Sequence, residues 1–537
     1  MKTNRLFVLA ATSLLMLSAC GGGQGGSEAS QTSQTSQSSQ TSQTSTSTSE
    51  AGSTSSEPTS TSTSDPSTSE SAHIDPENII TEPTTITVWS TYNDTYQAIL
   101  NACVDELQTL YPNITVNNVK QQGSYDDLKN MCISGFAVDN YPDLVAAYPD
   151  SVADFINNAK ALNVEDLMND PTIGWTEDDF EDIPTTYITA GQQYSIPGTY
   201  SLPAAKSTEA LYYNQDVLIG LNLSGIDPTI NKGKPLNDAY LKNLTWEELF
   251  DKLVPALDLY DQGLDEKNKI IDRTTYDDWA WVGYDSDDNF FITLAEQYDL
   301  GYTSINKVTG KGQILFNNDG MKDLMKKFRG YYDKHYFTTK GIIQTNVNYR
   351  STVDAMLFSI GSTGGVKYQF SSDNPHNVGV GHLPVAEDGY TSVISQGPDF
   401  AFLDHRASAR EKIYDNNRAK ATWLFYKLFT SFKYNVQWAT TTGYTPIRYS
   451  VMESAEYQDY SDYASKEDKT LDRLYALNAS YSGKVVDDLF TSPVFKGSSE
   501  ARNQVGTIFS LCAASTNLDA DIDGIFQTAV DNTILKM

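Results

Sequence analysis

The sequence predicts an α/β fold in which helices pack on the faces of a parallel sheet. Two observations lead to this prediction. From Thr84 onward, short apolar stretches alternate with longer ones whose apolar residues recur at helical spacing. The chain also has 537 residues, and a chain of this length is too long for one core. Its 33 Tyr, 21 Phe and 7 Trp provide ample apolar material for a globular body. Two large lobes, or about three domains, are therefore expected.

The expected elements follow one another in the order β-α-β-α-β. They are a strand at 85–89, a helix at 95–110, a strand at 114–119, a helix at 125–135 and a strand at 142–147. The carboxyl ends of parallel strands meet at one edge of a sheet, where α/β proteins bind ligands. Residues 89–94 and 148–150 follow two of these strands, so we expect them to face a ligand.

The N-terminus resembles an export signal. Lys2 and Arg5 precede an apolar stretch at 6–17, and residues 17–20 (Leu-Ser-Ala-Cys) resemble a bacterial lipobox. We expect 1–19 to be a lipoprotein signal peptide and Cys20 to carry the lipid. An ordinary secretory signal with an incidental cysteine is the alternative.

A Ser/Thr/Gln-rich tether is expected to follow at 20–75, because this stretch has scarcely any residue able to enter a core. The mature protein would then lie on the outer face of the cytoplasmic membrane, held there by the lipid anchor.

The charge of the chain excludes some functions. There are 69 Asp and Glu against 38 Lys and Arg, a formal net charge of −31. A chain this acidic repels nucleic acid, so no nucleic-acid partner is expected. The only long apolar run lies at the extreme N-terminus and is too short for a permanent membrane helix. A multi-pass membrane protein is therefore excluded.

The three cysteines of the body leave one question open. Cys103 and Cys132 can form a disulfide in an exported chain or remain two buried thiols on helices. The buried thiols are favoured, because both cysteines have apolar neighbours. Cys512 is expected in a core helix.

Motifs for metal binding and catalysis fail when their spacing is counted. Residues 519–524 begin like an EF-hand calcium loop, but the twelfth position is Val530 instead of the Glu that binds calcium. The stretch 285–289 also begins like such a loop, but Phe290 occupies the position where the turn needs Gly. The five His residues have no metal-ligand spacing, and no Gly-x-Ser-x-Gly elbow or P-loop is present. We expect no cofactor, no dedicated metal site and no enzymatic activity. An incidental calcium site remains open.

Six short motifs occur in an order that resembles a known family. They are 86–89 (Ile-Thr-Val-Trp), 111–116 (Tyr-Pro-Asn-Ile-Thr-Val), 210–216 (Ala-Leu-Tyr-Tyr-Asn-Gln-Asp), 244–249 (Leu-Thr-Trp-Glu-Glu-Leu), 379–384 (Gly-Val-Gly-His-Leu-Pro) and 439–448 (Ala-Thr-Thr-Thr-Gly-Tyr-Thr-Pro-Ile-Arg). Together they resemble the family 1 extracellular solute-binding proteins, the sugar-capturing lipoproteins of ABC importers. The resemblance covers about 84–537 and departs from shorter members in an acidic, Tyr-rich segment near 259–305.

The resemblance implies two α/β lobes joined at a hinge, with the ligand in the cleft between them. Hinge closure would present the closed form to the permease subunits of the importer, and a monomer without a cofactor is expected. Lobe 1 would comprise 84–198 and 385–442, and lobe 2 would comprise 199–384 and 443–537. The crossings would fall near 199–203, 383–385 and 442–444.

Sugar binding requires flat apolar surfaces and paired polar groups, and the resemblance indicates which loops supply them. The lobe 1 candidates are Trp89, Tyr92, Asp94, Tyr125, Asp126, Tyr148, Asp150 and Asp399. The lobe 2 candidates are Trp279, Trp281, Tyr284, Gly364, Gly365, Tyr444 and Arg448. Arg448 is either a clamp for a carboxylate or phosphate or an ion pair across the hinge, and the ion pair is favoured.

The predicted function is a tethered receptor that captures a sugar or oligosaccharide and delivers it to an ABC importer. One alternative is a glycerol-3-phosphate or phosphodiester receptor of the same family. The others are a tethered glycoside hydrolase, since two carboxylates in a groove suffice for that reaction, and a surface lectin.

Overall fold

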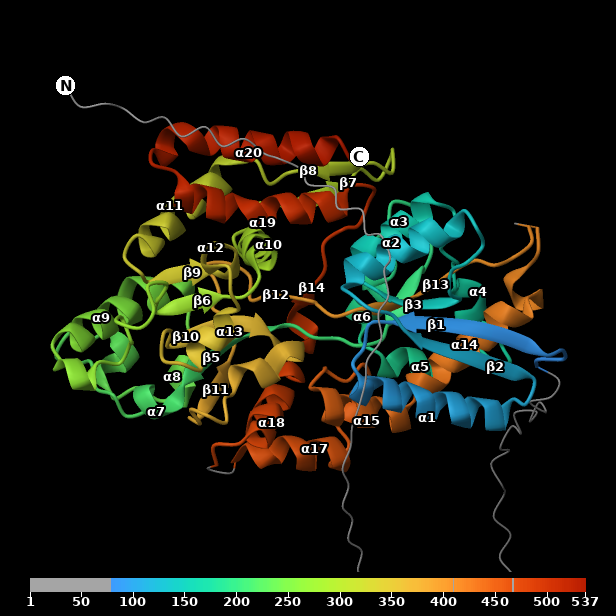
Figure 1. Cartoon of the computed structure of the whole chain (residues 1–537), viewed down its shortest axis with the longest axis horizontal. Coiled ribbons are helices and arrows are strands. Elements are labelled where there is room, and N and C mark those ends of the chain that lie inside the picture. Colours follow the sequence, from blue (N-terminus) through green and yellow to red (C-terminus); the bar gives the residue numbers. More distant parts are fainter. Residues whose placement is uncertain (1–78, 409, 466–467) are drawn as a thin grey trace, which may run out of the picture. The chain divides into compact units, whose positions relative to one another are not determined.

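The computed structural model describes residues 79–408, 410–465 and 468–537 (Figure 1). Contacts divide the chain after Glu70, and all residues described below belong to the second unit, Ser71–Met537. The predicted signal peptide (1–19), the lipidation site Cys20 and most of the predicted tether (20–75) lie outside the described residues.

The first sheet has the strand order β2-β1-β3-β13-β4. β1 pairs in parallel with β2 and β3, whereas β13 is antiparallel to both β3 and β4. The bounds are β1 (Thr84–Ser90), β2 (Ile114–Lys120), β3 (Leu144–Ala147), β4 (Ser201–Pro203) and β13 (Asp399–Phe402). The expected β-α-β-α-β order is confirmed, with α1 (Asp94–Leu110) and α2 (Tyr125–Phe136) between the strands. The sheet is mixed rather than parallel, because β4 and β13 join it from distant parts of the chain.

The second sheet has the order β11-β5-β10-β6-β9. β10, β6 and β9 run parallel, whereas β5 is antiparallel to both β10 and β11. The bounds are β5 (Glu209–Asn214), β6 (Val282–Tyr284), β9 (Phe337–Thr339), β10 (Phe358–Ser362) and β11 (Val378–Gly381). Two small pairs complete the strands, β7 (Thr303–Ile305) with β8 (Gly312–Ile314), and β12 (Val393–Ile394) with β14 (Leu489–Phe490). We call the parts built on the two large sheets the first and second lobes.

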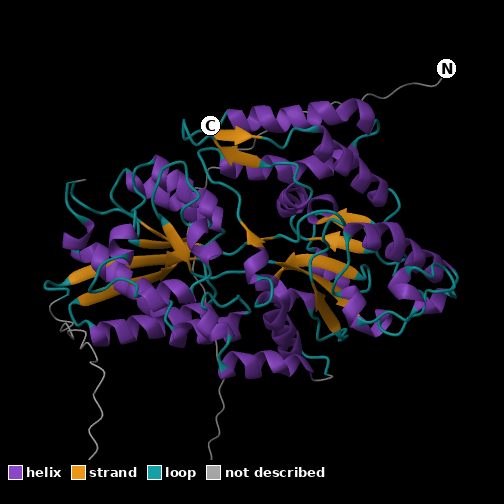
Figure 2. Ribbon diagram, turned by 180° about the vertical axis from the view of Figure 1, so that it is seen from behind, coloured by secondary structure: helices purple, strands orange, loops and turns teal. Residues whose placement is uncertain are grey.

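Helices flank both large sheets (Figure 2). The remaining α-helices are α3 (Pro149–Asn157), α4 (Glu165–Met168), α5 (Glu177–Asp182), α6 (Thr185–Ala190), α7 (Gln215–Leu218), α8 (Asp238–Leu241), α9 (Val254–Gln262), α10 (Asp287–Gln297), α11 (Asp319–Tyr332), α12 (Lys340–Ile343), α13 (Val347–Ser351), α14 (Asn417–Phe429), α15 (Phe432–Thr442), α16 (Tyr449–Met452), α17 (Ala455–Asp462), α18 (Leu471–Ser482), α19 (Ser498–Ala514) and α20 (Leu518–Ile534). Among the described residues, no helix has both the length and the apolar character needed to cross a bilayer.

Three chain segments run side by side between the two sheets. The Ala205 amide donates to the Pro398 carbonyl (3.1 Å), Ser207 and Gln396 exchange two bonds, and the Thr445 amide donates to the Lys206 carbonyl (2.7 Å). Two of these segments lie next to predicted crossings. The third is at 396–398 rather than 383–385, because Val385 pairs with Thr245 inside the second lobe. β4 also belongs to the first sheet although the sequence analysis assigned it to lobe 2. The lobe boundaries themselves stay a prediction.

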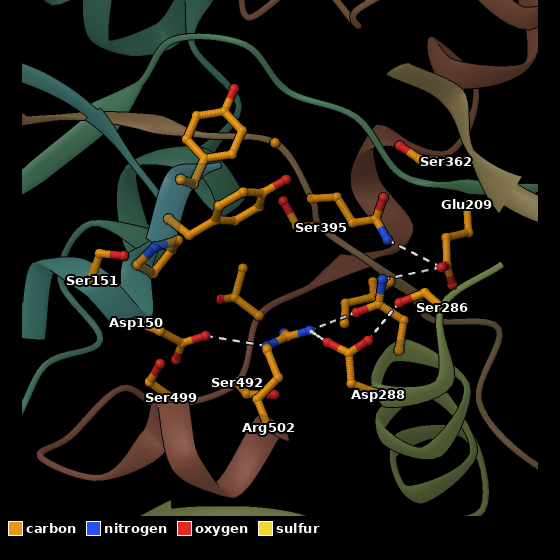
Figure 3. Close-up of a pocket in the computed structure, with 18 of the residues that line it drawn as sticks. Asp150, Ser151, Glu209, Ser286, Asp288, Ser362, Ser395, Ser492, Ser499 and Arg502 are labelled. Carbon is orange, nitrogen blue, oxygen red and sulfur yellow. Dashed lines mark hydrogen bonds and ion pairs between the residues drawn. The ribbon is translucent and has the colours of Figure 1, made fainter. Parts of the chain in front are cut away.

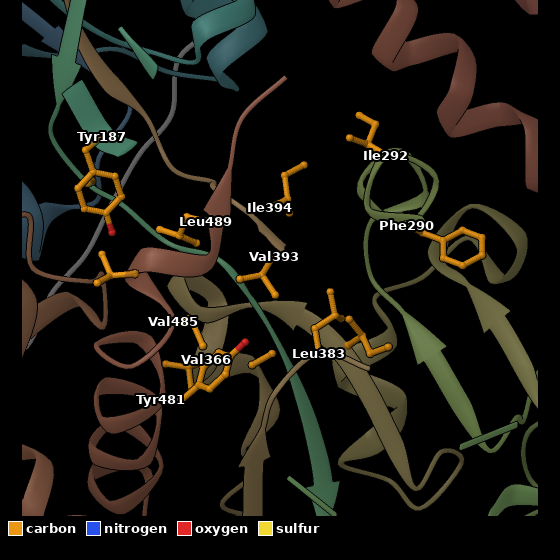
Figure 4. Packing of buried hydrophobic residues seen from close by; sticks show 14 of the residues in the cluster. Tyr187, Phe290, Ile292, Val366, Leu383, Val393, Ile394, Tyr481, Val485 and Leu489 are labelled. Atoms are coloured by element: carbon orange, nitrogen blue, oxygen red, sulfur yellow. The ribbon is translucent and has the colours of Figure 1, made fainter. Parts of the chain in front are cut away.

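One apolar cluster extends from the second lobe through the middle of the unit. Figure 4 shows Val393 and Ile394 of β12 and Leu489 of β14 lying between Tyr187 and the aromatic side chain of Phe290. The cysteines also belong to the core as buried free thiols, which is the favoured interpretation. Cys103 and Cys132 belong to different apolar clusters.

Candidate functional site

A cavity of about 480 Å³ is lined by residues of both lobes, a volume typical of small-molecule sites. Most of its lining groups are polar, and Figure 3 shows how they lie. Its hydroxyl and amide groups come from Ser124, Ser151, Ser286, Ser362, Ser395, Thr491, Ser492, Ser499, Asn289, Gln396 and Asn503. Its charged and aromatic side chains are Asp126, Asp150, Lys206, Glu209, Asp285, Asp288, Arg502, Tyr125 and Tyr148.

The two tyrosines come from the amino ends of α2 and α3. α2 begins at Tyr125 because Ser124 and Asp127 form a reciprocal capping box. α3 begins after Tyr148 because Pro149 occupies the first helical position, where its missing N–H costs nothing. The rings meet edge to face, with centroids 5.0 Å apart, and Tyr148 keeps 37% of its surface exposed. The first lobe therefore offers the cavity an aromatic surface.

Arg502 of α19 joins the two lobes across the cavity (Figure 3). Its Nε lies 3.1 Å from the Asp150 carboxylate of the first lobe, and its Nη1 lies 2.6 Å from Asp288 and 2.7 Å from the Asn289 side-chain oxygen of the second. Burial alone would lower the pKa of Arg502, but the carboxylates of Asp288 and Asp150 outweigh it and raise that pKa. Arg502 is therefore a charged bridge between the lobes.

Glu209, the first residue of β5, lies in the cavity wall with no exposed surface. Its carboxylate accepts hydrogen bonds from the Tyr284 hydroxyl and from the side-chain amides of Asn289 and Gln396, both at 3.1 Å. Burial is the main reason that the pKa of Glu209 rises to about 8. The cavity thus contains a carboxyl group that holds its proton at neutral pH.

Lys206 lies where the chain passes between the two sheets. It forms an ion pair with Asp399 of β13, and the side chains are 2% and 0% exposed. Asp399 also accepts a hydrogen bond from the Ser201 hydroxyl at 2.8 Å. One member of this buried pair, Lys206, therefore lines the cavity, whereas Asp399 does not.

Four of the predicted ligand-binding residues line this cavity: Tyr125, Asp126, Tyr148 and Asp150. The other candidates after β1 do not. Trp89 lines a separate surface groove beside α2, and Tyr92 is 3% exposed and packs edge-on against Trp438 at 5.1 Å. Asp94 is exposed and pairs with Lys120 at 2.6 Å.

The aromatic candidates of the second lobe lie in or near its core. Tyr284, the last residue of the short strand β6, and Trp281, which directly precedes this strand, are both 0% exposed, and all three residues of β6 are buried. Trp279 stacks on His335 with ring centroids 4.3 Å apart. The Tyr284 hydroxyl still reaches the cavity indirectly, through its bond to Glu209.

The remaining candidates lie at the lobe junction. Gly364 packs against Tyr444 so closely that a Cβ there would lie 2.9 Å from the ring. Tyr444 in turn stacks on Trp438 at 6.2 Å, and neither Gly364 nor Gly365 lines the cavity. Arg448 makes ion pairs with Asp179 (3.0 Å) and Asp182 (2.9 Å). The expected ion pair is present, and its position across the hinge stays a prediction.

The sequence analysis missed Lys206, Glu209 and Arg502. Lys206 and Glu209 left a local signal, because they are the only charged residues in the otherwise uncharged stretch 199–215. Arg502 left none, since its partners lie more than 200 residues away in the chain. Within residues 79–408, 410–465 and 468–537, no group of three or more His, Cys, Asp or Glu is placed to hold a metal ion.

Two mixed sheets joined by neighbouring crossing segments, with a polar cavity lined from both sides, define a two-lobe binding protein of the periplasmic type. The chain belongs to the bacterial extracellular solute-binding proteins: the family described as "Bacterial extracellular solute-binding protein" matches residues 102–465. This confirms the family resemblance at that level. A comparison with curated protein sequences finds no match.

Solved structures share the fold at low sequence identity. UgpB from Mycobacterium tuberculosis, in complex with glycerophosphocholine, is 16% identical with a TM-score of 0.59, over 84% of this chain and 99% of that one. The cyclic alpha-maltosyl-1,6-maltose binding protein from Arthrobacter globiformis is 15% identical with a TM-score of 0.58, over 84% and 99%. The maltotriose-bound MalE domain from Bdellovibrio bacteriovorus is 13% identical with a TM-score of 0.55, over 84% and 100%.

Replacing Arg502 by Met is expected to loosen the contact between the lobes, because Asp150 and Asp288 would face each other without a cation. About 1–2 kcal/mol of unfolding free energy should be lost, less than for a fully buried pair, since the side chain is 31% exposed. Spin labels on Val138→Cys and Leu259→Cys, both exposed, would report a longer interlobe distance. Lys433→Met, which breaks an exposed pair, is the control. An unchanged distance would contradict the bridging role.

Proposed function

We propose that this protein is a non-catalytic receptor that captures a sugar or oligosaccharide in the cavity and delivers it to an ABC importer. One observation carries the proposal: the edge-to-face pair of Tyr125 and Tyr148 lines the cavity together with many hydroxyl, amide and carboxyl groups. Aromatic rings stack on the C–H faces of sugars, while such polar groups bond their hydroxyls. Structural neighbours that bind maltotriose and cyclic maltosyl-maltose support it.

The remaining parts of the proposal concern place and partners. The protein would be anchored through Cys20 to the outer face of the cytoplasmic membrane and act as a monomer. Ligand contacts from both lobes would favour the closed form, because only that form makes them together. The closed form would then dock on the permease subunits.

The test is a thermal-shift screen of the protein against maltose, maltotriose, galactobiose, xylobiose and chitobiose. A sugar at 100 times its dissociation constant adds about 2.7 kcal/mol of stability, which is readily detected. Chromatography of each mixture after prolonged incubation separates the receptor from the hydrolase alternative, since a receptor returns its oligosaccharide intact. Cleaved product, or stabilisation by no sugar, would count against the proposal.

Replacing Tyr148 by Ala is expected to weaken binding of the stabilising sugar by about 1–3 kcal/mol, because the exposed ring is lost as a stacking surface. Titration calorimetry measures the change. Tyr390→Ala is the matched control, since Tyr390 is 54% exposed and does not line the cavity. Equal affinities for the two variants would remove Tyr148 from the site.

A further inference from the structure

The cations that line the cavity are already bonded to carboxylates of the protein. Lys206 pairs with Asp399, and Arg502 bridges Asp150 and Asp288. Among the described residues of the lining, these two are the only Lys or Arg side chains. Sites for phosphate or carboxylate groups ordinarily offer an Arg or Lys for direct, charge-assisted bonds. An anionic group entering here would have to compete with a resident carboxylate for either cation.

Helix amino termini are the other common binding sites for anions, because their N–H groups and dipole favour negative charge. Four α-helices begin at the cavity, and each carries at least one acidic residue in its first turn. These are Asp126 and Asp127 on α2, Asp150 on α3, Asp287 and Asp288 on α10, and Glu500 on α19. Each of these helices therefore already carries a carboxylate of the protein in the turn where an anion would bind. Both usual means of holding an anion are thus shared with acidic side chains of the protein itself.

Glu209 shows how the cavity treats a negative charge. It has no exposed surface, and its three hydrogen-bond donors, Tyr284, Asn289 and Gln396, are all neutral. Burial first, and the nearby Asp288 as well, raise its pKa to about 8. Three tyrosines near Glu209 have raised pKa values, namely those at 212, 284 and 481. The other ionisable groups that line the cavity are Tyr125, Asp126, Tyr148, Asp150, Lys206, Asp285 and Arg502. Glu209, whose bonding partners are all neutral, thus keeps its proton at pH 7, whereas the pKa of Asp288 beside Arg502 is lowered.

We propose that the cavity admits only solutes without a negative charge and rejects phosphorylated and acidic sugars, with Glu209 as a specificity-determining residue. This inference rests on the proposed function, and it favours a neutral sugar over glycerol-3-phosphate as the ligand. A hydroxyl group can donate to the carboxyl groups of the wall, whereas a phosphate or uronate would lose its hydration without gaining a free cation. Anion binding would also require Glu209 to stay protonated, so it weakens as pH rises.

The experiment compares neutral and anionic members of matched pairs by titration calorimetry at pH 7. The pairs are galactobiose with digalacturonate, and maltose with maltose 6′-phosphate. Glycerol is compared with glycerol-3-phosphate. In any pair that binds, we expect the neutral member to bind roughly a hundredfold more tightly, since juxtaposed like charges cost several kcal/mol. An anionic member that binds as tightly as its neutral partner overturns the inference, whereas a panel in which nothing binds overturns the proposed function beneath it.

The pH dependence of the preference for the neutral ligand tests whether Glu209 causes this preference. In the wild-type protein, the preference for the neutral member should grow roughly tenfold between pH 7 and pH 9, as the buried carboxyl group loses its proton. In Glu209→Gln the preference should stay constant, and in Glu387→Gln, which alters an exposed carboxylate, it should follow the wild type. Should Glu209→Gln fail to fold, the wild-type profile still decides, because a preference that is flat from pH 7 to pH 9 contradicts the role of Glu209.

Discussion

Replacing Lys206 by Met is expected to cost about 3–5 kcal/mol of unfolding free energy, because Asp399 would be left buried without its cation. The two side chains are 2% and 0% exposed, and the Ser201 hydroxyl is too weak a partner to compensate a full charge. Met preserves most of the length and apolar volume of the lysine, so the loss reports the charge rather than a cavity. Urea unfolding at pH 7 measures it.

Two controls make this result specific. The double variant Lys206→Met with Asp399→Leu should recover most of the stability, since removing both charges leaves no uncompensated ion. Lys120→Met, which breaks the exposed pair with Asp94, should change the stability by less than about 1 kcal/mol. A Lys206→Met variant as stable as the Lys120→Met control would contradict the structural role of the pair.

The position of this pair connects stability with function. Lys206 belongs to one of the three segments that run side by side between the sheets, and Asp399 directly follows another, at 396–398. A buried ion pair has a defined geometry, and breaking it is costly, so it resists sliding of one segment past another. Motion between the lobes would then have to occur by changes of backbone angle around these segments, as in a hinge.

The first lobe could be predicted from the sequence because its elements are local. Each of its first three strands is followed or preceded by a helix within a few residues, and apolar periodicity alone places them. The carboxyl end of the third strand led to Tyr148 and Asp150, and the start of the second helix led to Tyr125 and Asp126; all four line the cavity. The antiparallel strands β4 and β13 could not be placed in this way, since their partners are distant in sequence.

The second wall of the cavity depends on contacts that no local pattern encodes. Glu209 meets Gln396 across 187 residues, and Arg502 meets Asp150 across 352. Trp281 and Tyr284 were chosen by a rule that holds for exposed loops. The rule fails here because Trp281 directly precedes β6, Tyr284 ends it, and every residue of this strand is buried. Trp281 therefore belongs to the core that supports the wall, rather than to the wall itself.

Replacing Trp281 by Ala is accordingly expected to cost about 3–5 kcal/mol of unfolding free energy, the range for a buried Trp that leaves a cavity behind. The side chain is 0% exposed, and its indole N–H donates to the Asp258 carboxylate at 3.3 Å. Trp281→Phe keeps most of the volume, so it should lose less. Urea unfolding ranks the three proteins.

The comparison with Tyr148 turns this prediction into a test of where the ligand lies. Trp281→Ala, below its unfolding transition, should bind the stabilising sugar with nearly wild-type affinity, because the indole does not line the cavity. Tyr148→Ala should keep its stability to within about 1 kcal/mol but lose affinity, since its ring is partly exposed. If Trp281→Ala instead remained stable and lost affinity, the indole would have to contact the ligand. The ligand would then lie on the second sheet, away from the cavity bridged by Arg502.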